Sequence, residues 1–149
     1  MENNQATLFR DNKVVEESWE LFTENLDGIE KASHALVSLD LWDKNLIRER
    51  SVGVLLKTSD DVLKLPPEVL DSPVIAIQID NFNDGRFFSQ AKLLRQRLSY
   101  SGEIRANGDV LLDQVQAMVR CGINSFELND LDNDIERYFS TFSESYQKA

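Results

Sequence analysis

Residues 83–128 read NDGRFFSQAKLLRQRLSYSGEIRANGDVLLDQVQAMVRCGINSFEL, and patterns typical of helix, strand, helix and strand follow one another there with almost no spacer. The first helical part has one apolar stripe at helical spacing, formed by Phe87, Ala91, Leu94 and Leu98. Residues 103–106 and 125–128 are short runs typical of strands. Strands that alternate with helices favour parallel pairing through helical crossovers. The stretch therefore predicts an α/β fold.

Three more strands are predicted upstream, at residues 35–39, 52–56 and 74–79, and the last of them is largely β-branched. A charged helix is expected over 40–49. A short helix should begin at Asp60 or Asp61 and end before Pro66. Gly122 is expected to terminate the helix that contains Leu111, Val115 and Met118. A closing helix is predicted from a final apolar stripe, which consists of Ile135, Phe139, Phe142 and Tyr146.

The amino-terminal part has a different pattern. Two short extended runs between Ala6 and Phe22 flank Asp11 and Asn12, a turn-prone pair, and they predict a hairpin or a hairpin-like arm. A length of 149 residues fits one domain. We therefore expect a single α/β domain over 1–149, with an N-terminal arm at 1–33 and βα units at 34–149. Its sheet should be mainly parallel, with about five strands and right-handed helical crossovers.

The charged strand at 103–106 bears on the shape of that sheet. Side chains alternate along a strand, so Glu103 and Arg105 lie on one face and Ile104 lies on the other. A charged face is costly if helices cover both sides of the sheet, but it is tolerated where it lines a lumen. This favours a partial (β/α) barrel over a flat doubly wound sheet, with Glu127 of the next strand beside the pair.

The composition excludes several classes of partner. The chain has 26 acidic and 16 basic residues and a net charge of −10, which argues against binding to nucleic acid or to an anionic membrane. Its apolar runs are too short for a transmembrane helix, and the polar amino end does not resemble a secretory signal. The single cysteine agrees with a reducing compartment, so we expect a cytoplasmic protein.

Motifs for cofactors are few. One histidine and one cysteine cannot build a Cys/His zinc site or ligate an iron-sulfur cluster, so no intrinsic metal site is expected. The sequence contains neither G-x-G-x-x-G nor a Walker motif. A flavin site without a motif stays open, and the cofactor is unknown. Cys121 is interpreted as a buried structural cysteine, and His34 as a structural or surface residue.

The candidate site lies where the strands end, because ligands of α/β folds collect at the carboxyl ends of the strands. Residues 84–120 carry six basic and four acidic residues, in contrast to the acidic remainder. Arg105 could clamp an anion, with Glu103 or Glu127 as acid or base. The candidate residues for binding an anion or a partner are Arg86, Arg105, Asn107, Gly108, Asp109, Asp113 and Gln114.

Two alternatives accompany this site. The amides of Gly108 and Asp109 could cradle an anion at a helix N-terminus, but Asp109 as a capping residue would compete for the same amides. Arg105 could instead form a buried ion pair with Glu103 or Glu127 that only holds the sheet together.

Three runs, DGRFFSQAKLLRQR, GEIRANGDVLLDQ and MVRCGINSFEL, resemble a bacterial family of unknown function whose members are described as oxidoreductases of sulfite reduction. Members are usually encoded beside assimilatory sulfite reductase. A weaker similarity reaches the strand pair that ends near Trp19 and the segment from Leu36 to Trp42. Phe87 departs from the family pattern, since relatives tend to have glycine there. The matched positions are Asp84, Gly85, Arg86, Ser89, Gln90, Arg95, Glu103, Arg105, Gly108, Asp109, Asp113, Gln114, Arg120, Cys121, Gly122, Phe126 and Glu127.

The resemblance implies a place in sulfite assimilation. Sulfite reduction needs siroheme and an iron-sulfur cluster, which a chain with one cysteine cannot ligate. We therefore expect an accessory protein that binds sulfite reductase, its cofactor or an anionic intermediate. Two alternatives stay open: a small enzyme acting on an anionic substrate at the strand ends, and a structural or oligomerisation module. The sequence does not decide whether the protein forms a homo-oligomer.

Overall fold

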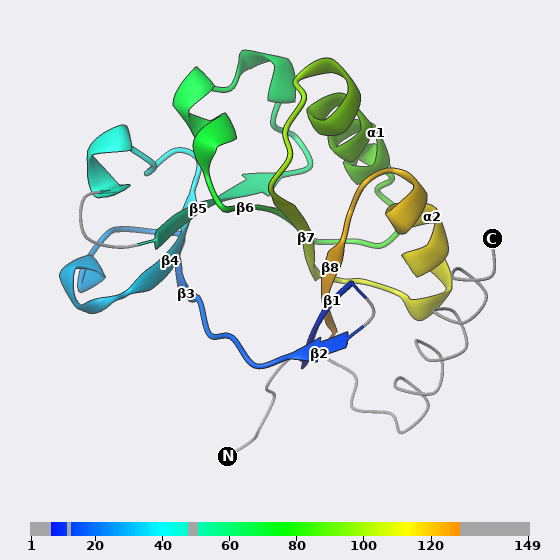
Figure 1. Ribbon diagram of the computed structural model, residues 1–149, viewed down its shortest axis with the longest axis horizontal. Helices are drawn as coiled ribbons and strands as arrows, with labels where there is room; N and C mark the ends of the chain where they lie inside the picture. Colours follow the sequence, from blue (N-terminus) through cyan, green and yellow to red (C-terminus); the bar gives the residue numbers. More distant parts are fainter. Residues whose placement is uncertain (1–6, 12, 48–50, 129–149) are drawn as a thin grey trace.

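The computed structural model describes residues 7–11, 13–47 and 51–128. In this part of the chain, eight strands form one sheet in the order β2-β1-β8-β7-β6-β5-β4-β3. The strands are β1 (Thr7–Arg10), β2 (Lys13–Val15), β3 (Glu20–Phe22), β4 (His34–Ser38), β5 (Ser51–Lys57), β6 (Val74–Ile79), β7 (Glu103–Gly108) and β8 (Ser125–Leu128). The sheet curls into an open half barrel with the helical segments outside it (Figure 1).

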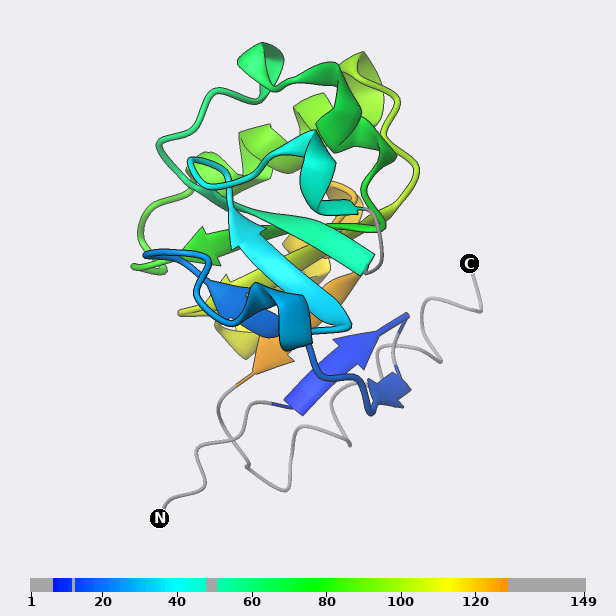
Figure 2. The same cartoon turned by 90° about the vertical axis from the view of Figure 1, so that its left-hand side faces the viewer.

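The predicted mainly parallel sheet is confirmed, but the sheet has more strands than predicted. Strands β3 to β8 pair in parallel, as the alternation of strands and helices indicated. The hairpin of β1 and β2 joins the same sheet, because β1 pairs antiparallel with β8. Figure 2 shows β1 (blue) next to β8 (orange). The third additional strand, β3, adds to the other side of the sheet by pairing with β4.

The helical segments outside the sheet are short. The described chain has two α-helices, α1 (Arg86–Lys92) and α2 (Val115–Arg120), and α1 continues as the π-helix η5 (Leu93–Arg97). The remaining segments are 3-10 helices, namely η1 (Ile29–Lys31), η2 (Lys44–Ile47), η3 (Val62–Lys64), η4 (Pro67–Asp71) and η6 (Leu112–Gln114). No helix of the described residues combines the length and apolar character needed to cross a membrane.

Two helix predictions differ in outcome. Of the helix predicted over 40–49, the described residues up to 47 form only η2, and the Asp43 carboxylate caps its start by accepting from the Asn45 amide at 3.0 Å. Residues 48–49 of this prediction lie outside the described residues. The short helix after Asp61 is confirmed as η3, and the Asp61 carboxylate caps it by accepting from the Leu63 amide at 3.0 Å. The predicted closing helix over 135–146 lies outside the described residues.

The two faces of the sheet have different cores. On the convex face, Val54, Ile75 and Ile104 lie in register on adjacent strands and are fully buried beneath the helices. Phe87 is completely buried in this core. A smaller cluster belongs to the concave face and consists of Leu36, Leu55, Val74 and Ala76, with Trp19 packed against it. Side chains therefore fill the interior of the half barrel.

Arg95 connects the turn at the end of α2 with the segment that precedes β7. As predicted, Gly122 terminates this helix, with φ of 107° and a Schellman pair in which Gly122 N–H donates to Val119 O and Ile123 N–H donates to Met118 O. Arg95 of η5 crosses over this turn and donates to Gly122 O at 2.8 Å, and also to Tyr100 O and Gly102 O. The segment before β7 is thus held in place, and with it Glu103, the first residue of the strand.

Candidate functional site

Arg105 lies at the centre of the concave face. It pairs in register with Ala76 on one side and with Ser125 on the other, so its neighbours across the sheet are small. The space above these small residues accommodates a long side chain, and Arg105 is only 1% exposed. Glu103 is on the same face, as alternation predicted, and its Oε2 accepts from Arg105 Nη2 at 2.8 Å.

Arg105 is one member of a closed ring of ion pairs. Glu103 Oε1 lies 2.9 Å from Arg10 Nη1, which belongs to β1. Arg10 also makes two hydrogen bonds to Glu17, with Nη1 to Oε1 at 3.1 Å and Nη2 to Oε2 at 2.9 Å. Glu17 Oε1 closes the ring at 3.5 Å from Arg105 Nη2. Two arginines and two glutamates therefore neutralise one another inside the half barrel.

Trp19 borders the ring on one side. Its indole Nε1–H donates to Glu17 Oε1 at 3.1 Å, and the Arg105 guanidinium carbon lies 5.8 Å from the centre of its rings. The edge of His34 meets the same indole, with ring centroids 5.0 Å apart. His34 is thus an exposed residue in contact with Trp19, which agrees with its interpretation as a structural or surface histidine.

The ring changes the acidity of its members. The hydrogen bond from Arg10 is the main cause that holds the pKa of the Glu17 carboxyl below its usual value, and the Trp19 indole contributes to the same shift. The hydrogen bond to Glu17 in turn raises the pKa of Arg10. Glu17 is therefore a carboxylate at neutral pH, and it stays one in mildly acidic solution.

The Asn107-Gly108-Asp109 turn differs from the predicted anion cradle. Gly108 is the last residue of β7, and the Asp109 amide donates to Ile79 O at 2.7 Å, so this amide is already engaged. The helical segment that follows begins only at Leu112, so Asp109 is not its capping residue. The Asp109 carboxylate accepts instead from the Phe82 amide at 2.9 Å. The described structure therefore has no helix N-terminus at this turn, and anion binding by Gly108 and Asp109 stays a prediction.

The other predicted residues lie at the same edge of the sheet. Arg86 pairs with Asp84 at 2.8 Å, and Asp84 also accepts from the Thr58 hydroxyl at 2.7 Å. Asp113 is exposed on η6, and Gln114 Nε2 donates to Phe82 O at 3.4 Å. These bonds connect neighbouring loops to one another.

Asn107 and Glu127 lie on the strands themselves. Asn107 is buried on β7, opposite Gln78, and its Oδ1 has no hydrogen-bond partner among the described residues. Glu127 pairs in register with Leu8 of β1. Ser125, rather than Glu127, lies opposite Arg105, which places Glu127 two residues further along β8.

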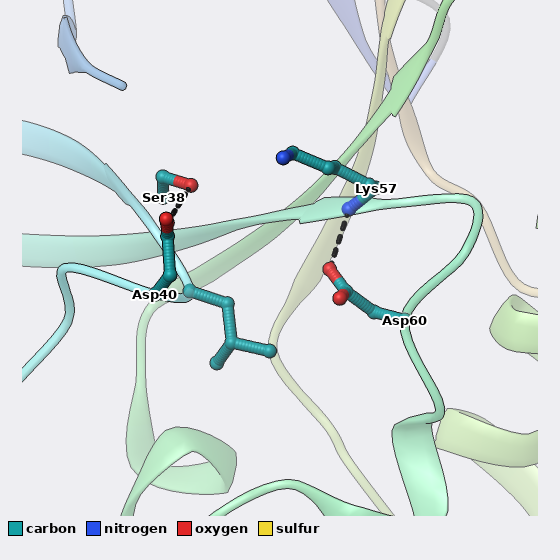
Figure 3. A pocket seen from close by; sticks show the side chains of 5 residues that line it. Ser38, Asp40, Lys57 and Asp60 are labelled. Atoms are coloured by element: carbon teal, nitrogen blue, oxygen red, sulfur yellow. Dashed lines mark hydrogen bonds between the residues drawn. The ribbon is translucent and has the colours of Figure 1, made fainter. Parts of the chain in front are cut away.

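A polar pocket opens at the carboxyl ends of β4 and β5. It has a volume of about 150 Å³ and is lined by Ser38, Leu39, Asp40, Lys57 and Asp60. Figure 3 shows Ser38 and Asp40 on one side of it and Lys57 and Asp60 on the other. The Ser38 hydroxyl donates to Asp40 at 2.6 Å and is the main cause that lowers the pKa of this carboxyl. Two carboxylates and one ammonium group thus line the pocket.

The surface around this pocket is acidic. The loops that leave β4, β5, β6 and β7, at residues 39–43, 58–61, 80–85 and 109–111, hold seven aspartates and no lysine or arginine. We call these four loops the carboxyl edge. Several of its aspartates bond backbone amides and so order the loops, as Asp60 does for Lys57 and Asp109 for Phe82. Among the described residues, no group of three or more His, Cys, Asp or Glu side chains is placed to hold a metal ion.

Comparison with known families gives a match over most of the chain. The model of a family described as "Bacterial protein of unknown function (DUF934)" matches residues 53–149. The chain belongs to this family. Comparisons with curated proteins and with solved structures gave no match.

The residues that match the DUF934 family model include only part of the ion-pair ring. Glu103 and Arg105 lie inside the matched residues, whereas Arg10, Glu17 and Trp19 lie in the part of the chain before them. Sequence reasoning found the first two from strand alternation and missed the other three. A partial signal existed, because Leu8 and Arg10 lie on one face of the predicted hairpin strand and Phe9 lies on the other. The pairing of β1 with β8, which brings Arg10 to Glu103, has no local sequence signal.

Proposed function

We propose that this DUF934 protein is an accessory component of assimilatory sulfite reduction, which docks on a basic surface of sulfite reductase through its carboxyl edge. The resemblance to proteins encoded beside the reductase supports the choice of partner. The acidic carboxyl edge supports the mode of binding, since complementary charge steers two proteins together and selects the partner.

The observation that carries this proposal is an exposed aromatic ring within the acidic edge. Phe82 is 39% exposed, although most phenylalanine side chains are buried. Its backbone is held on both sides, by Asp109 through the amide and by Gln114 through the carbonyl. The ring is thus presented by an ordered loop between Asp80 and Asp84. An apolar anchor surrounded by charged residues is typical of protein interfaces.

The geometry favours docking over catalysis at the residues proposed from the sequence. Both carboxylate oxygens of Glu103 are engaged by arginines, Oε1 by Arg10 and Oε2 by Arg105. A general acid or base needs a proton-accepting group that is available to the substrate. Glu103 would have to break an ion pair first, which makes it a poor candidate for this role.

Binding of purified sulfite reductase from the same host to immobilised protein tests the proposal. Asp80→Lys and Phe82→Ser should each weaken binding by about tenfold or more, because the first reverses a charge of the edge and the second removes the anchor. Glu68→Lys and Leu21→Ser are matched controls on exposed residues outside the four loops, and they should bind like the wild type. Binding should also weaken as salt is added.

Two results would contradict the proposal. The first is that the wild-type protein does not bind the reductase at low ionic strength. The second is that the control variants weaken binding as much as the variants of the edge, because the contact would then lie elsewhere or be a general effect of charge.

A further inference from the structure

We propose that Arg10, Arg105 and the indole N–H of Trp19 form a binding site for a small inorganic oxyanion, and that Glu17 is its internal ligand, which the external anion displaces. This site lies on the concave face and is distinct from the carboxyl edge. Glu103 and Arg10 are near the start of β7, whereas the proposed docking surface follows the ends of the parallel strands. The inference does not depend on the proposed function.

The donors around Glu17 converge as they would on an oxyanion. Its Oε1 accepts from Arg10 Nη1 and from Trp19 Nε1, each at 3.1 Å, and Arg105 Nη2 lies 3.5 Å away. Its Oε2 accepts from Arg10 Nη2 at 2.9 Å. A bidentate guanidinium with further N–H donors recognises the oxygens of sulfate, sulfite or phosphate in the same way as those of a carboxylate.

The two glutamates of the ring are not equally replaceable. The Glu103 side chain is 11% exposed. Glu103 is the first residue of β7, and Arg95 holds the segment before this strand in place by donating to Gly102 O. Glu17 belongs to the connection between β2 and β3, and its side chain is 34% exposed. Ion pairs that reach solvent are weak, so an anion from solution can compete with Glu17 more readily than with Glu103.

The charge of the site favours an anion once Glu17 has moved away. Arg10 and Arg105 then face Glu103 alone, which leaves one net positive charge. Arg105 is 1% exposed, so this charge lies where water screens it poorly. An oxyanion that reaches both guanidinium groups therefore replaces the lost carboxylate, and Trp19 lies beside it with a free donor.

Titration of sulfate into Glu17→Ala tests this inference. The variant lacks the internal competitor, so it should bind sulfate at least about tenfold more tightly than the wild type. In a Trp42→Phe background, Trp19 is the remaining tryptophan and reports binding through its fluorescence. Glu16→Ala removes the same charge from the neighbouring exposed residue and should bind sulfate like the wild type. Arg10→Ala combined with Glu17→Ala should not bind sulfate.

Thermal melting in sulfate provides a second readout. Sulfate stabilises most proteins in a general way, so only a larger rise of Tm in Glu17→Ala than in the wild type supports the site. Phosphate should act like sulfate, and acetate should act more weakly because it offers fewer oxygens. Equal sulfate effects on the wild type, Glu17→Ala and the Arg10→Ala double variant would overturn the inference. If the double variant does not fold, Trp19→Phe with Glu17→Ala takes its place, and undiminished sulfate binding there would count against the indole donor.

Discussion

Among the glycines with a left-handed backbone conformation, Gly28 and Gly122 have different surroundings. Gly28 has φ of 85° and open space around it, whereas a side chain at Gly122, with φ of 107°, would collide with Arg95. Gly28→Ala should therefore cost only the conformational strain, about 1 kcal/mol. Gly122→Ala should cost about 3 kcal/mol or more, because Arg95 must also leave the carbonyls that it bonds. Urea unfolding of both variants measures the free energy that each one loses. Equal losses of unfolding free energy would show that Arg95 moves aside at no cost.

Cys121 is a second residue whose role can be separated from function. The sequence predicted a buried cysteine, but the residue is only half-buried at the end of α2. Cys121→Ser should change the free energy of unfolding by about 1 kcal/mol or less. Binding of the reductase should not change. A serine variant that folds normally but does not bind would assign a function to the thiol.

At the scale of elements, the amino-terminal arm depends on a titratable contact. The folded pKa of Glu17 lies below its usual value of 4.5, with Arg10 as the main cause. The contact therefore stabilises the fold above the unfolded pKa, and this contribution is lost as the pH falls through the folded pKa. Glu17→Gln should have a lower Tm than the wild type at about pH 7, and this difference in Tm should be smaller at about pH 3.

A matched variant isolates this effect. Glu16→Gln changes the neighbouring exposed carboxylate, and the difference between its Tm and that of the wild type should vary little between the two pH values. If the difference in Tm between Glu17→Gln and the wild type stays constant from neutral to acidic pH, the contact between Glu17 and Arg10 does not stabilise the fold in this way.

The elements that the sequence predicted best are those with a strong local signal. Residues 74–79 and 125–128 were predicted with the bounds of β6 and β8, because buried or β-branched runs flanked by turn residues specify strands locally. β3 was missed because three residues, of which only Phe22 is buried, give no clear pattern. The start of the helix predicted over 40–49 was placed too early, because Asp43 caps the helical segment and η2 begins only at Lys44.

The same distinction applies to the candidate site. Alternation along a single strand was enough to place Glu103 and Arg105 on one face inside a curled sheet. The partners of this pair come from distant parts of the chain, Arg10 through antiparallel pairing and Glu17 from a segment without regular structure. Such long-range contacts depend on the completed sheet, and a local sequence pattern does not encode them.

At the scale of the whole molecule, polar contacts span the opening of the half barrel. The two edge strands of the described sheet are β2 and β3, which are joined by residues 16–19. In Figure 1 this connection runs along the open side of the curl. Glu17 and Trp19 extend from it to Arg105 on β7, near the middle of the sheet. The ring thus connects the edge of the sheet with its centre, where backbone hydrogen bonds do not close the barrel.

Arg105 is the residue on which this closure depends most. Arg105→Met keeps much of the volume of the side chain but removes its charge, leaving Glu103 with Arg10 as its remaining partner in the ring. Breaking a buried pair from one side costs about 3–5 kcal/mol, and the contact to Arg10 places the expected loss at the lower end of this range. Urea unfolding should show this loss, whereas Arg86→Met, at an exposed pair, should leave the midpoint of urea unfolding nearly unchanged. If Arg105→Met has the same midpoint of urea unfolding as the wild type, the ring contributes little to the stability of the half barrel. The role of Arg105 would then be binding.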